Sequence, residues 1–238
     1  MKIFLDDRSV VFTTSTPNIV LPSDHIVWYE NPEQLETEYV NFKINEECKK
    51  MIIVDRPTSA MSARDAFLLL FKQIEAAGGL VKSEKGAYLF IHRMGLWDLP
   101  KGKIDHKDIQ QALAIPGALL PEPGFFIPDI ENNQEQPIPH PVYARIAAIR
   151  EVKEETGLKS VSITSDIPCT FHIYTRKEKH ILKKTFWFGM STDSGQPLKP
   201  QASEGIFLAK WISHNGIQCV MNHTYASVME LITREITL

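Results

Sequence analysis

Residues 141–157, PVYARIAAIREVKEETG, predict an α-helix with three glutamates on one face. The repulsion among these glutamates has to be offset by other groups. The proline at the start of the helix suits a first helical turn, and the glycine at its end suits a C-terminal cap. Glu151, Glu154 and Glu155 stand at positions i, i+3 and i+4, so a helix brings all three carboxylates to one face. Like charges at this spacing repel one another. Either basic neighbours neutralise them on a solvated face, or the three glutamates share a task.

The composition is that of an ordinary folded protein. The 238 residues suit one large domain or two small ones, with 43% hydrophobic and 23% charged residues. The formal net charge of −3 argues against wholesale nucleic-acid binding but allows a local basic patch. Cys48, Cys169 and Cys219 share no short spacing and suit a reducing compartment. The apolar run 66–71 is too short to span a bilayer and no secretory signal is recognisable, so we expect a soluble, cytoplasmic protein.

The first part of the chain predicts a small α/β domain over residues 1–76. Pro32 suits the first turn of a helix over residues 31–44. A second helix is expected over residues 62–79, ended by Gly78 and Gly79, and the domain boundary is expected at this glycine pair. Strands are expected over residues 2–5, 9–14, 25–30 and 49–55.

The second part, residues 77–238, predicts a larger domain that is rich in strands. Residues 79–104 suit two or three strands in succession. A C-terminal helix is expected over residues 219–236. Further strands are expected over residues 161–166, 170–176, 183–192 and 206–212.

Residues 106–140 interrupt this pattern. Seven of the 15 prolines lie between Pro116 and Pro141, which forbids a long helix or a central strand there. The apolar patches ALAIPGALL and GFFIP argue against a fully solvated linker. We therefore expect an inserted segment that packs partly on the body of the domain or on a neighbouring subunit.

The predicted helix and the strand before the insertion together resemble the signature of the Nudix hydrolase family. That signature is a glycine, five residues, a glutamate, seven residues, then Arg-Glu, an apolar residue, any residue, Glu-Glu, any residue, a glycine and an apolar residue. Gly102, in LWDLPKGKI, matches its opening. The second half is matched without a miss by Arg150, Glu151, Val152, Glu154, Glu155, Gly157 and Leu158. The resemblance covers residues 77–238 and says nothing of the first domain.

The resemblance implies an α/β fold of the Nudix type, an α/β/α sandwich around a mixed sheet. It also implies hydrolysis of a pyrophosphate linkage with Mg²⁺, or with Mn²⁺ in its place, because divalent ions offset the charge of the phosphates. The metal ligands that it implies are Gly102, Glu151, Glu154 and Glu155. Arg150 would position one of the motif carboxylates. Magnesium prefers carboxylate oxygens, so its binding would also remove the repulsion among the glutamates.

The match departs from the family pattern at the insertion. Arg150 stands 48 positions after Gly102, where the pattern has 14, so 34 residues are additional. The first glutamate of the signature falls on Val142 when counted back from Arg150 and on Asp108 when counted forward from Gly102. Asp105 and Asp108 are the available substitutes, although each also suits a solvated turn.

A further acid, on the loop before a late strand, often serves this family as a metal ligand or as the base. Here that acid is Glu204, which also suits an ordinary exposed loop, and Glu151 is the competing candidate for the base. Arg93, Lys101 and Lys103 bracket the motif glycine and are the candidates for binding substrate phosphates.

The expected protein is therefore an enzyme that hydrolyses a small nucleoside-diphosphate-linked or polyphosphate substrate, such as a dinucleoside polyphosphate or a nucleotide sugar. The alternative is a Nudix-fold regulatory protein that senses a nucleotide without hydrolysing it. Such proteins tend to lose the motif glutamates, which are present here. The basic turn at residues 176–184 is either a solvated face or a part of phosphate recognition. A homodimer is an open alternative to a monomer, and neither a membrane nor nucleic acid is an expected partner.

Overall fold

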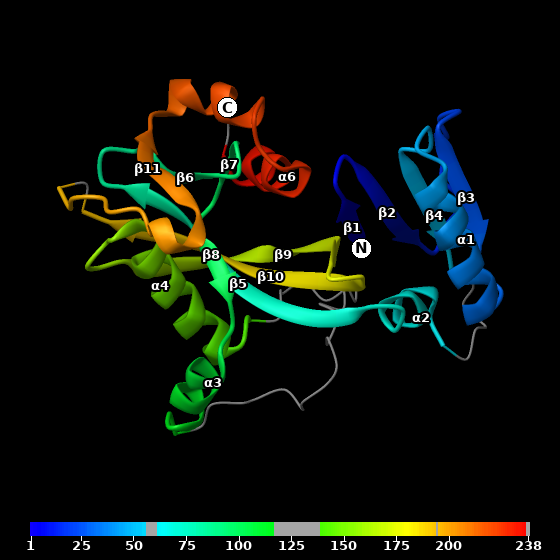
Figure 1. Cartoon of the computed structure of the whole chain (residues 1–238), viewed down its shortest axis with the longest axis horizontal. Coiled ribbons are helices and arrows are strands. Elements are labelled where there is room, and N and C mark those ends of the chain that lie inside the picture. Colours follow the sequence, from blue (N-terminus) through cyan, green and yellow to red (C-terminus); the bar gives the residue numbers. More distant parts are fainter. Residues whose placement is uncertain (56–60, 117–138, 194, 237–238) are drawn as a thin grey trace. The chain divides into compact units, whose positions relative to one another are not determined.

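The computed structural model describes residues 1–55, 61–116, 139–193 and 195–236 (Figure 1). The chain divides into two compact units. Unit 1 comprises Met1–Ile74 and Thr170–Lys184, and unit 2 comprises Glu75–Cys169 and Thr185–Leu238. Helices and strands occur in both units, and the strand pairings are both parallel and antiparallel, so the expected mixed α/β class is confirmed. None of the helices in the described ranges is long and apolar enough to cross a membrane.

Unit 1 is a mixed sheet covered by two helices, α1 (Pro32–Ile44) and α2 (Ala63–Leu68). β1 pairs antiparallel with β2 and parallel with β9, whereas β2 and β3 both pair parallel with β4. Phe12 of β2 packs edge-on against Phe67 of α2, with ring centroids 5.5 Å apart, so α2 covers this face of the sheet. The strands are β1 (Lys2–Leu5), β2 (Arg8–Thr13), β3 (Asp24–Trp28), β4 (Lys50–Val54) and the outer part of β9 (Ser162–Arg176).

Unit 2 is built on five neighbouring strands in the order β11-β6-β5-β10-β9, with β7 paired to β6 and β8 paired to β5. The remaining strands are β5 (Lys72–Ser83), β6 (Tyr88–Arg93), β7 (Leu96–Asp98), β8 (Lys101–Lys103), β10 (Lys179–Thr192) and β11 (Ile206–Ile212). The helical elements are α3 (His106–Leu113), α4 (Val142–Thr156), α5 (Ile217–Met221), α6 (Ala226–Glu235) and the single turns η1 (Ala202–Glu204) and η2 (His214–Gly216).

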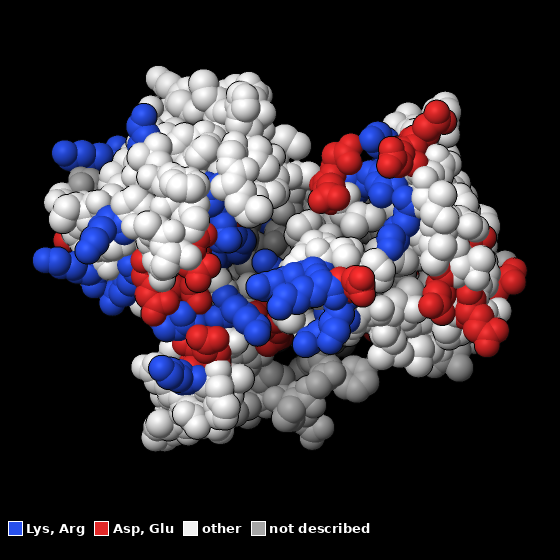
Figure 2. Space-filling view, in the orientation of Figure 1, with Lys and Arg blue, Asp and Glu red and all other residues white. Residues whose placement is uncertain are grey.

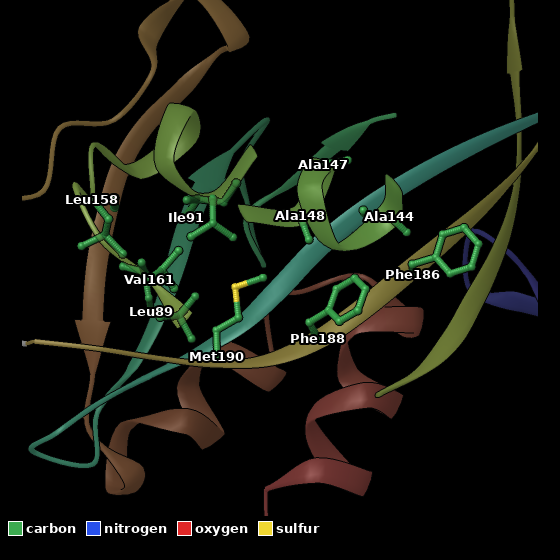
Figure 3. Close-up of a cluster of buried hydrophobic side chains, with 14 of the residues drawn as sticks. Leu89, Ile91, Ala144, Ala147, Ala148, Leu158, Val161, Phe186, Phe188 and Met190 are labelled. Carbon is green, nitrogen blue, oxygen red and sulfur yellow. The ribbon is translucent and has the colours of Figure 1, made fainter. Parts of the chain in front are cut away.

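Two buried clusters lie on opposite faces of the strands of unit 2. On one face, the alanines of α4 pack in one cluster with β6 and β10, including Ile91 and Phe188 (Figure 3). On the other face, Phe90 and Trp187 pack with α5 and α6, including Leu231. Alternate residues of a strand face opposite ways, which is how β6 and β10 serve both clusters. Helices therefore cover both faces of this sheet, as in the expected α/β/α sandwich.

The helix predicted over residues 62–79 is wrong beyond Leu68, because residues 72–83 form β5. Gly78 and Gly79 do not end a helix. A side chain on Gly78 would collide with Lys101, and a side chain on Gly79 would collide with Met190. The two glycines instead let β8 and β10 approach β5 closely.

The division into units differs from the expected boundary in one segment, Thr170–Lys184. β9 and β10 are 15 and 14 residues long, and the outer part of β9 pairs with β1 through Ile3↔Phe171 and Phe4↔His172. This pairing joins the segment to unit 1, although the sequence assigned residues 77–238 to one domain.

Two further expectations about single segments have mixed outcomes. The C-terminal helix predicted over residues 219–236 is broken between α5 and α6, because Trp97 N donates to His223 O at 2.9 Å and Thr224 Oγ1 donates to Trp97 O at 2.7 Å. Of the insertion predicted over residues 106–140, residues 106–113 form α3. Residues 117–138 lie outside the described residues, so how that part of the insertion packs remains a prediction.

Candidate active site

Helix α4 carries the charged motif residues Arg150, Glu151, Glu154 and Glu155. Gly157 ends the helix in the left-handed conformation, with a φ of 78°, as expected of a C-terminal cap. The three glutamates differ in their surroundings, since the side chain of Glu154 is 49% exposed and that of Glu155 is 3% exposed. Figure 2 shows acidic side chains over α4 bordered by basic ones. One helix face therefore presents carboxylates in different environments.

Arg150 connects two of these glutamates with the strand opposite. Its Nη1 donates to Glu151 Oε1 at 2.7 Å and to Glu154 Oε2 at 3.0 Å, and its Nη2 donates to Lys103 O at 3.0 Å. The shared guanidinium offsets the repulsion between the two carboxylates. Its pKa is raised, mainly by the hydrogen bonds to Asp108 and further by Glu151, so the guanidinium stays charged.

Asp108, the third residue of α3, anchors the other edge of this guanidinium. Its Oδ1 accepts from Arg150 Nε at 2.9 Å, its Oδ2 accepts from Arg150 Nη2 at 2.8 Å, and Oδ2 also accepts from Asp105 N at 2.7 Å. The side chain is 2% exposed, so the interpretation of Asp108 as a solvated turn residue is wrong. Burial raises its pKa and the Arg150 hydrogen bonds lower it by more, so the net pKa lies below its ordinary value.

Glu155 faces β6 and β8 from the same helix. Its Oε2 accepts from Lys101 N at 2.7 Å, and Arg93 Nη1 lies 3.5 Å from its Oε1. Burial raises the pKa of Glu155 to about 7, although Lys101 and Arg93 both act to lower it. Both protonation states of this carboxyl are thus accessible near neutral pH.

The ammonium group of Lys101 forms an ion pair with the buried carboxylate of Asp98. Its Nζ donates to Asp98 Oδ2 at 2.7 Å, and Asp98 Oδ1 accepts from Leu99 N at 2.8 Å. Burial lowers the pKa of Lys101, but Asp98 and Glu155 raise it by more. Among the three candidates for phosphate binding, Lys103 is exposed, whereas Arg93 and Lys101 are partly buried against carboxylates.

Gly102 lies directly against the carboxylate of Glu151. A Cβ built on Gly102 would collide with the carboxylate oxygens of Glu151, so only glycine leaves room for this approach. Burial raises the pKa of Glu151, partly opposed by Arg150.

The side chains that α4 presents at this point are carboxylates, whose oxygens are the donor type that Mg²⁺ prefers. Within the described residues, however, no group of three or more His, Cys, Asp or Glu is arranged to hold a metal. The carboxylates are instead turned to Arg150, Lys101 N and Arg93. The carboxylates therefore suit Mg²⁺ in the chemistry of their oxygens, and the Glu151 carboxylate fills the space that Gly102 leaves.

Glu204 ends the turn η1 and is exposed. The loop before it is fastened to the end of α4, because Gln201 N donates to Glu155 O at 3.2 Å and Lys199 N donates to Thr156 O at 2.8 Å. The structure thus brings the loop of Glu204 to the end of α4 that carries Glu155.

Two residues of this site were not expected to be buried partners. Asp108 had a signal in the sequence, since it stands at the place of the first motif acid counted from Gly102. Asp98 had none, because nothing in WDLP predicts that its carboxylate pairs with Lys101. Asp108 holds Arg150 in place, and Asp98 holds Lys101.

Comparisons with known proteins identify similar solved structures but no family model. No protein-family model and no curated protein matches the chain. The MutT protein from Methanosarcina mazei Go1 is similar at 19% identity and a TM-score of 0.42, over 69% of this chain and 93% of that one. An Ap4A hydrolase from C. elegans is similar at 19% identity and a TM-score of 0.40, over 68% and 93%. The Nudix domain of Shewanella oneidensis NrtR, solved with ADP-ribose, is similar at 14% identity and a TM-score of 0.40, over 70% and 90%.

Proteins described as Nudix are thus among the solved structures similar to this chain. We base the functional proposal on the side chains of the site, not on these likenesses.

Proposed function

We propose that the chain is a Nudix-type hydrolase that cleaves a pyrophosphate linkage in a small nucleotide-linked or polyphosphate substrate. The observation that carries this proposal is the packing of the Glu151 carboxylate on Gly102, with Arg150 bonded to Glu151 and Glu154 at once. A merely solvated glutamate face would need neither a glycine opposite nor a guanidinium held by a buried aspartate. These contacts support a helix face that is built to present carboxylates.

Magnesium, or manganese in its place, would be held by Gly102, Glu151, Glu154 and Glu155 and would offset the negative charge of the phosphates. Arg150 would keep Glu151 and Glu154 in position. Lys103, which is exposed, would contact substrate phosphates directly.

In the reaction, the oxygen of a water molecule forms a bond to phosphorus as the bridging P–O bond breaks. The leaving phosphate takes the electron pair. The proton of the water passes to Glu204 or Glu151, the two candidates for the base. Glu204 suits this role because its loop is bonded to the end of α4, and Glu151 suits it because it lies on α4 itself.

Hydrolysis by the purified protein of a panel of nucleotide sugars, dinucleoside polyphosphates and nucleoside triphosphates, with Mg²⁺ present, tests the proposal. Glu154→Gln and Glu155→Gln should each reduce turnover by about a hundredfold or more, because electrostatic groups at a phosphoryl centre contribute on that scale. Glu36→Gln, an exposed glutamate of α1, is the matched control and should leave turnover unchanged. Mn²⁺ binding, followed by the spin-resonance signal of the free ion, should weaken in the two α4 variants and not in the control.

If the wild-type chain bound nucleotides from the panel and hydrolysed none of them, it would belong to the nucleotide-sensing class instead. Near wild-type turnover in either α4 variant would contradict the metal-binding role of the glutamates. We also propose a cytoplasmic location, because an odd number of cysteines without a short spacing, Cys48, Cys169 and Cys219, suits a reducing compartment.

A further inference from the structure

The outer half of the β9–β10 hairpin carries a concentration of positive charge. Residues 170–184 contain five lysine or arginine residues and one glutamate, so their formal charge is +4, whereas that of the whole chain is −3. This segment belongs entirely to unit 1. Figure 2 shows lysine and arginine side chains gathered where the β9–β10 hairpin turns in Figure 1.

The two faces of this hairpin have different surroundings. Phe171 and Ile173 are buried, and Ile3, which pairs with Phe171, is fully buried as well. This face lies toward α1, because Lys43 Nζ of α1 is 3.1 Å from His180 Nε2. Since side chains alternate along a strand, the residues between these positions lie on the face away from the helices.

That second face carries rings and cations side by side, and we call it the ring-and-cation face. On β9 it contains His172, Tyr174 and Arg176, and the first two rings are stacked, with centroids 5.8 Å apart and an interplanar angle of 29°. Lys183 Nζ of β10 lies 5.2 Å from the centroid of the Tyr174 ring, which places Lys183 on the same face. By alternation Lys179 shares this face with Lys183.

The ring-and-cation face continues onto β1. Phe4 pairs with His172 in the parallel register, and Lys2 Nζ lies 4.7 Å from the centroid of the Phe4 ring. The Phe4 ring is itself buried, so the rings that this face can offer to a ligand are those of β9. Glu178 is the single acid of the hairpin segment.

The hairpin is closed by an unusual pair of residues. Lys177 and Glu178 adopt positive φ values of 47° and 62°, a conformation in which glycine or asparagine is preferred. A residue with a Cβ is less stable in this conformation than glycine, and such outliers cluster at functional positions. The tip therefore keeps its charge at the expense of local stability.

The other side of the tip is fastened to α1. The Lys43 ammonium can only donate, so Nε2 of His180 is the acceptor and Nδ1 carries the proton, which it donates to Thr175 Oγ1 at 3.1 Å. Burial and Lys43 both lower the pKa of His180, which keeps its ring neutral. The face of the hairpin opposite the ring-and-cation face is thus bonded to α1 through His180.

We propose that the ring-and-cation face binds single-stranded nucleic acid. Single strands are bound without sequence preference by grooves or faces in which cations contact phosphates and aromatic rings stack on bases. Both groups are present here at the spacing of a β-strand, whereas a face that only had to be solvated would need no row of rings. The remainder of the chain carries a formal charge of −7, so the positive charge is local to this segment and the net charge of −3 does not reveal it.

Fluorescence anisotropy of the full chain with a labelled oligouridylate of roughly 12 nucleotides, within the site sizes of single-strand binders, tests the proposal. Binding should weaken with salt, with a logarithmic slope of about −0.7 for each phosphate contact. Joint replacement Arg176→Gln and Lys179→Gln should therefore make the slope shallower by roughly 1.4. Lys210→Gln, an exposed lysine on β11 of unit 2, is the control and should leave the slope unchanged.

Tyr174→Leu tests the ring separately from the charge. The variant should bind the oligouridylate about 5- to 100-fold more weakly with an unchanged salt slope, and Tyr174→Phe should bind like the wild type. Circular dichroism and the unfolding midpoint of each variant establish that the hairpin still forms. The proposal is overturned if the wild type does not bind, if the Arg176/Lys179 variant binds as well as the control, or if inorganic polyphosphate binds as tightly as RNA and Tyr174→Leu changes neither.

Discussion

Replacing Asp108 with asparagine should destabilise unit 2 far more than the same change at Asp105. The Asp108 carboxylate accepts two hydrogen bonds from Arg150, at 2.8 and 2.9 Å, and one from Asp105 N at 2.7 Å. Its side chain is 2% exposed. Asparagine keeps the shape of the side chain but removes the charge opposite a guanidinium that cannot lose its own. An uncompensated charge is then left in a partly buried place.

The magnitude follows from the partners that Arg150 retains. Removing one member of a buried ion pair costs about 3–5 kcal/mol. Arg150 keeps Glu151, Glu154 and the Lys103 carbonyl, and its side chain is 25% exposed, so part of its charge stays compensated. We therefore expect a loss of about 2–3 kcal/mol in the free energy of unfolding.

Asp105→Asn is the matched control. Its carboxylate lies 3.9 Å from Arg150 Nη2 and its side chain is 59% exposed. An exposed pair at this distance contributes little, so the control should lose less than about 0.5 kcal/mol.

The difference between wild type and Asp108→Asn should also depend on pH. Burial raises the pKa of Asp108, but the Arg150 hydrogen bonds lower it by more, so the folded pKa lies below the ordinary 3.8. An acid with a depressed folded pKa contributes stability above its unfolded pKa and loses it as the pH falls through the folded pKa. The difference should therefore be complete at neutral pH and shrink as the pH falls below 3.8.

Urea unfolding followed by tryptophan fluorescence measures these losses in the free energy of unfolding. The signal reports mainly on unit 2, because three of the four tryptophans lie there, namely Trp97, Trp187 and Trp211. Equal losses in Asp108→Asn and Asp105→Asn would refute the assignment of Asp108 as the buried partner of Arg150. A difference that persisted unchanged in acid would refute its electrostatic origin.

Three further predictions concern the site. Gly102→Ala should lower turnover by about a hundredfold and reduce the free energy of unfolding by about 1–3 kcal/mol, because the added Cβ displaces the Glu151 carboxylate. Steady-state kinetics and thermal unfolding measure the two effects, and unchanged turnover would contradict the prediction. Glu204→Gln should bind substrate almost normally yet turn over at least about a hundredfold more slowly, as a general base would, and a loss below about threefold in single-turnover hydrolysis would leave Glu151 as the base. Asp98→Asn should destabilise unit 2 by about 3 kcal/mol by leaving the Lys101 ammonium buried without its partner, and an unchanged urea midpoint would contradict that pairing.

The short-range patterns of the sequence were sufficient for several elements. The helix that carries the glutamates runs over Val142–Thr156 with its cap at Gly157, and α1 begins at Pro32, as the pattern of proline, apolar and glycine positions predicts. β1, β2 and β4 occur where their apolar runs predict them. These features depend on neighbours a few positions away, which a sequence displays directly.

Contacts between distant positions decided the rest. Asp108 and Arg150 are 42 positions apart, and only the packing of α3 against α4 makes Asp108 a buried partner instead of a turn residue. Glu155 is buried because Lys101 N, 54 positions before it, faces its carboxylate. The glycines in residues 72–83 looked like a helix stop, yet adjacent strands need them to approach β5. Local sequence specifies the charge and the helical face of the glutamates, whereas the partner and the burial of each one depend on which strands and helices the fold brings beside it.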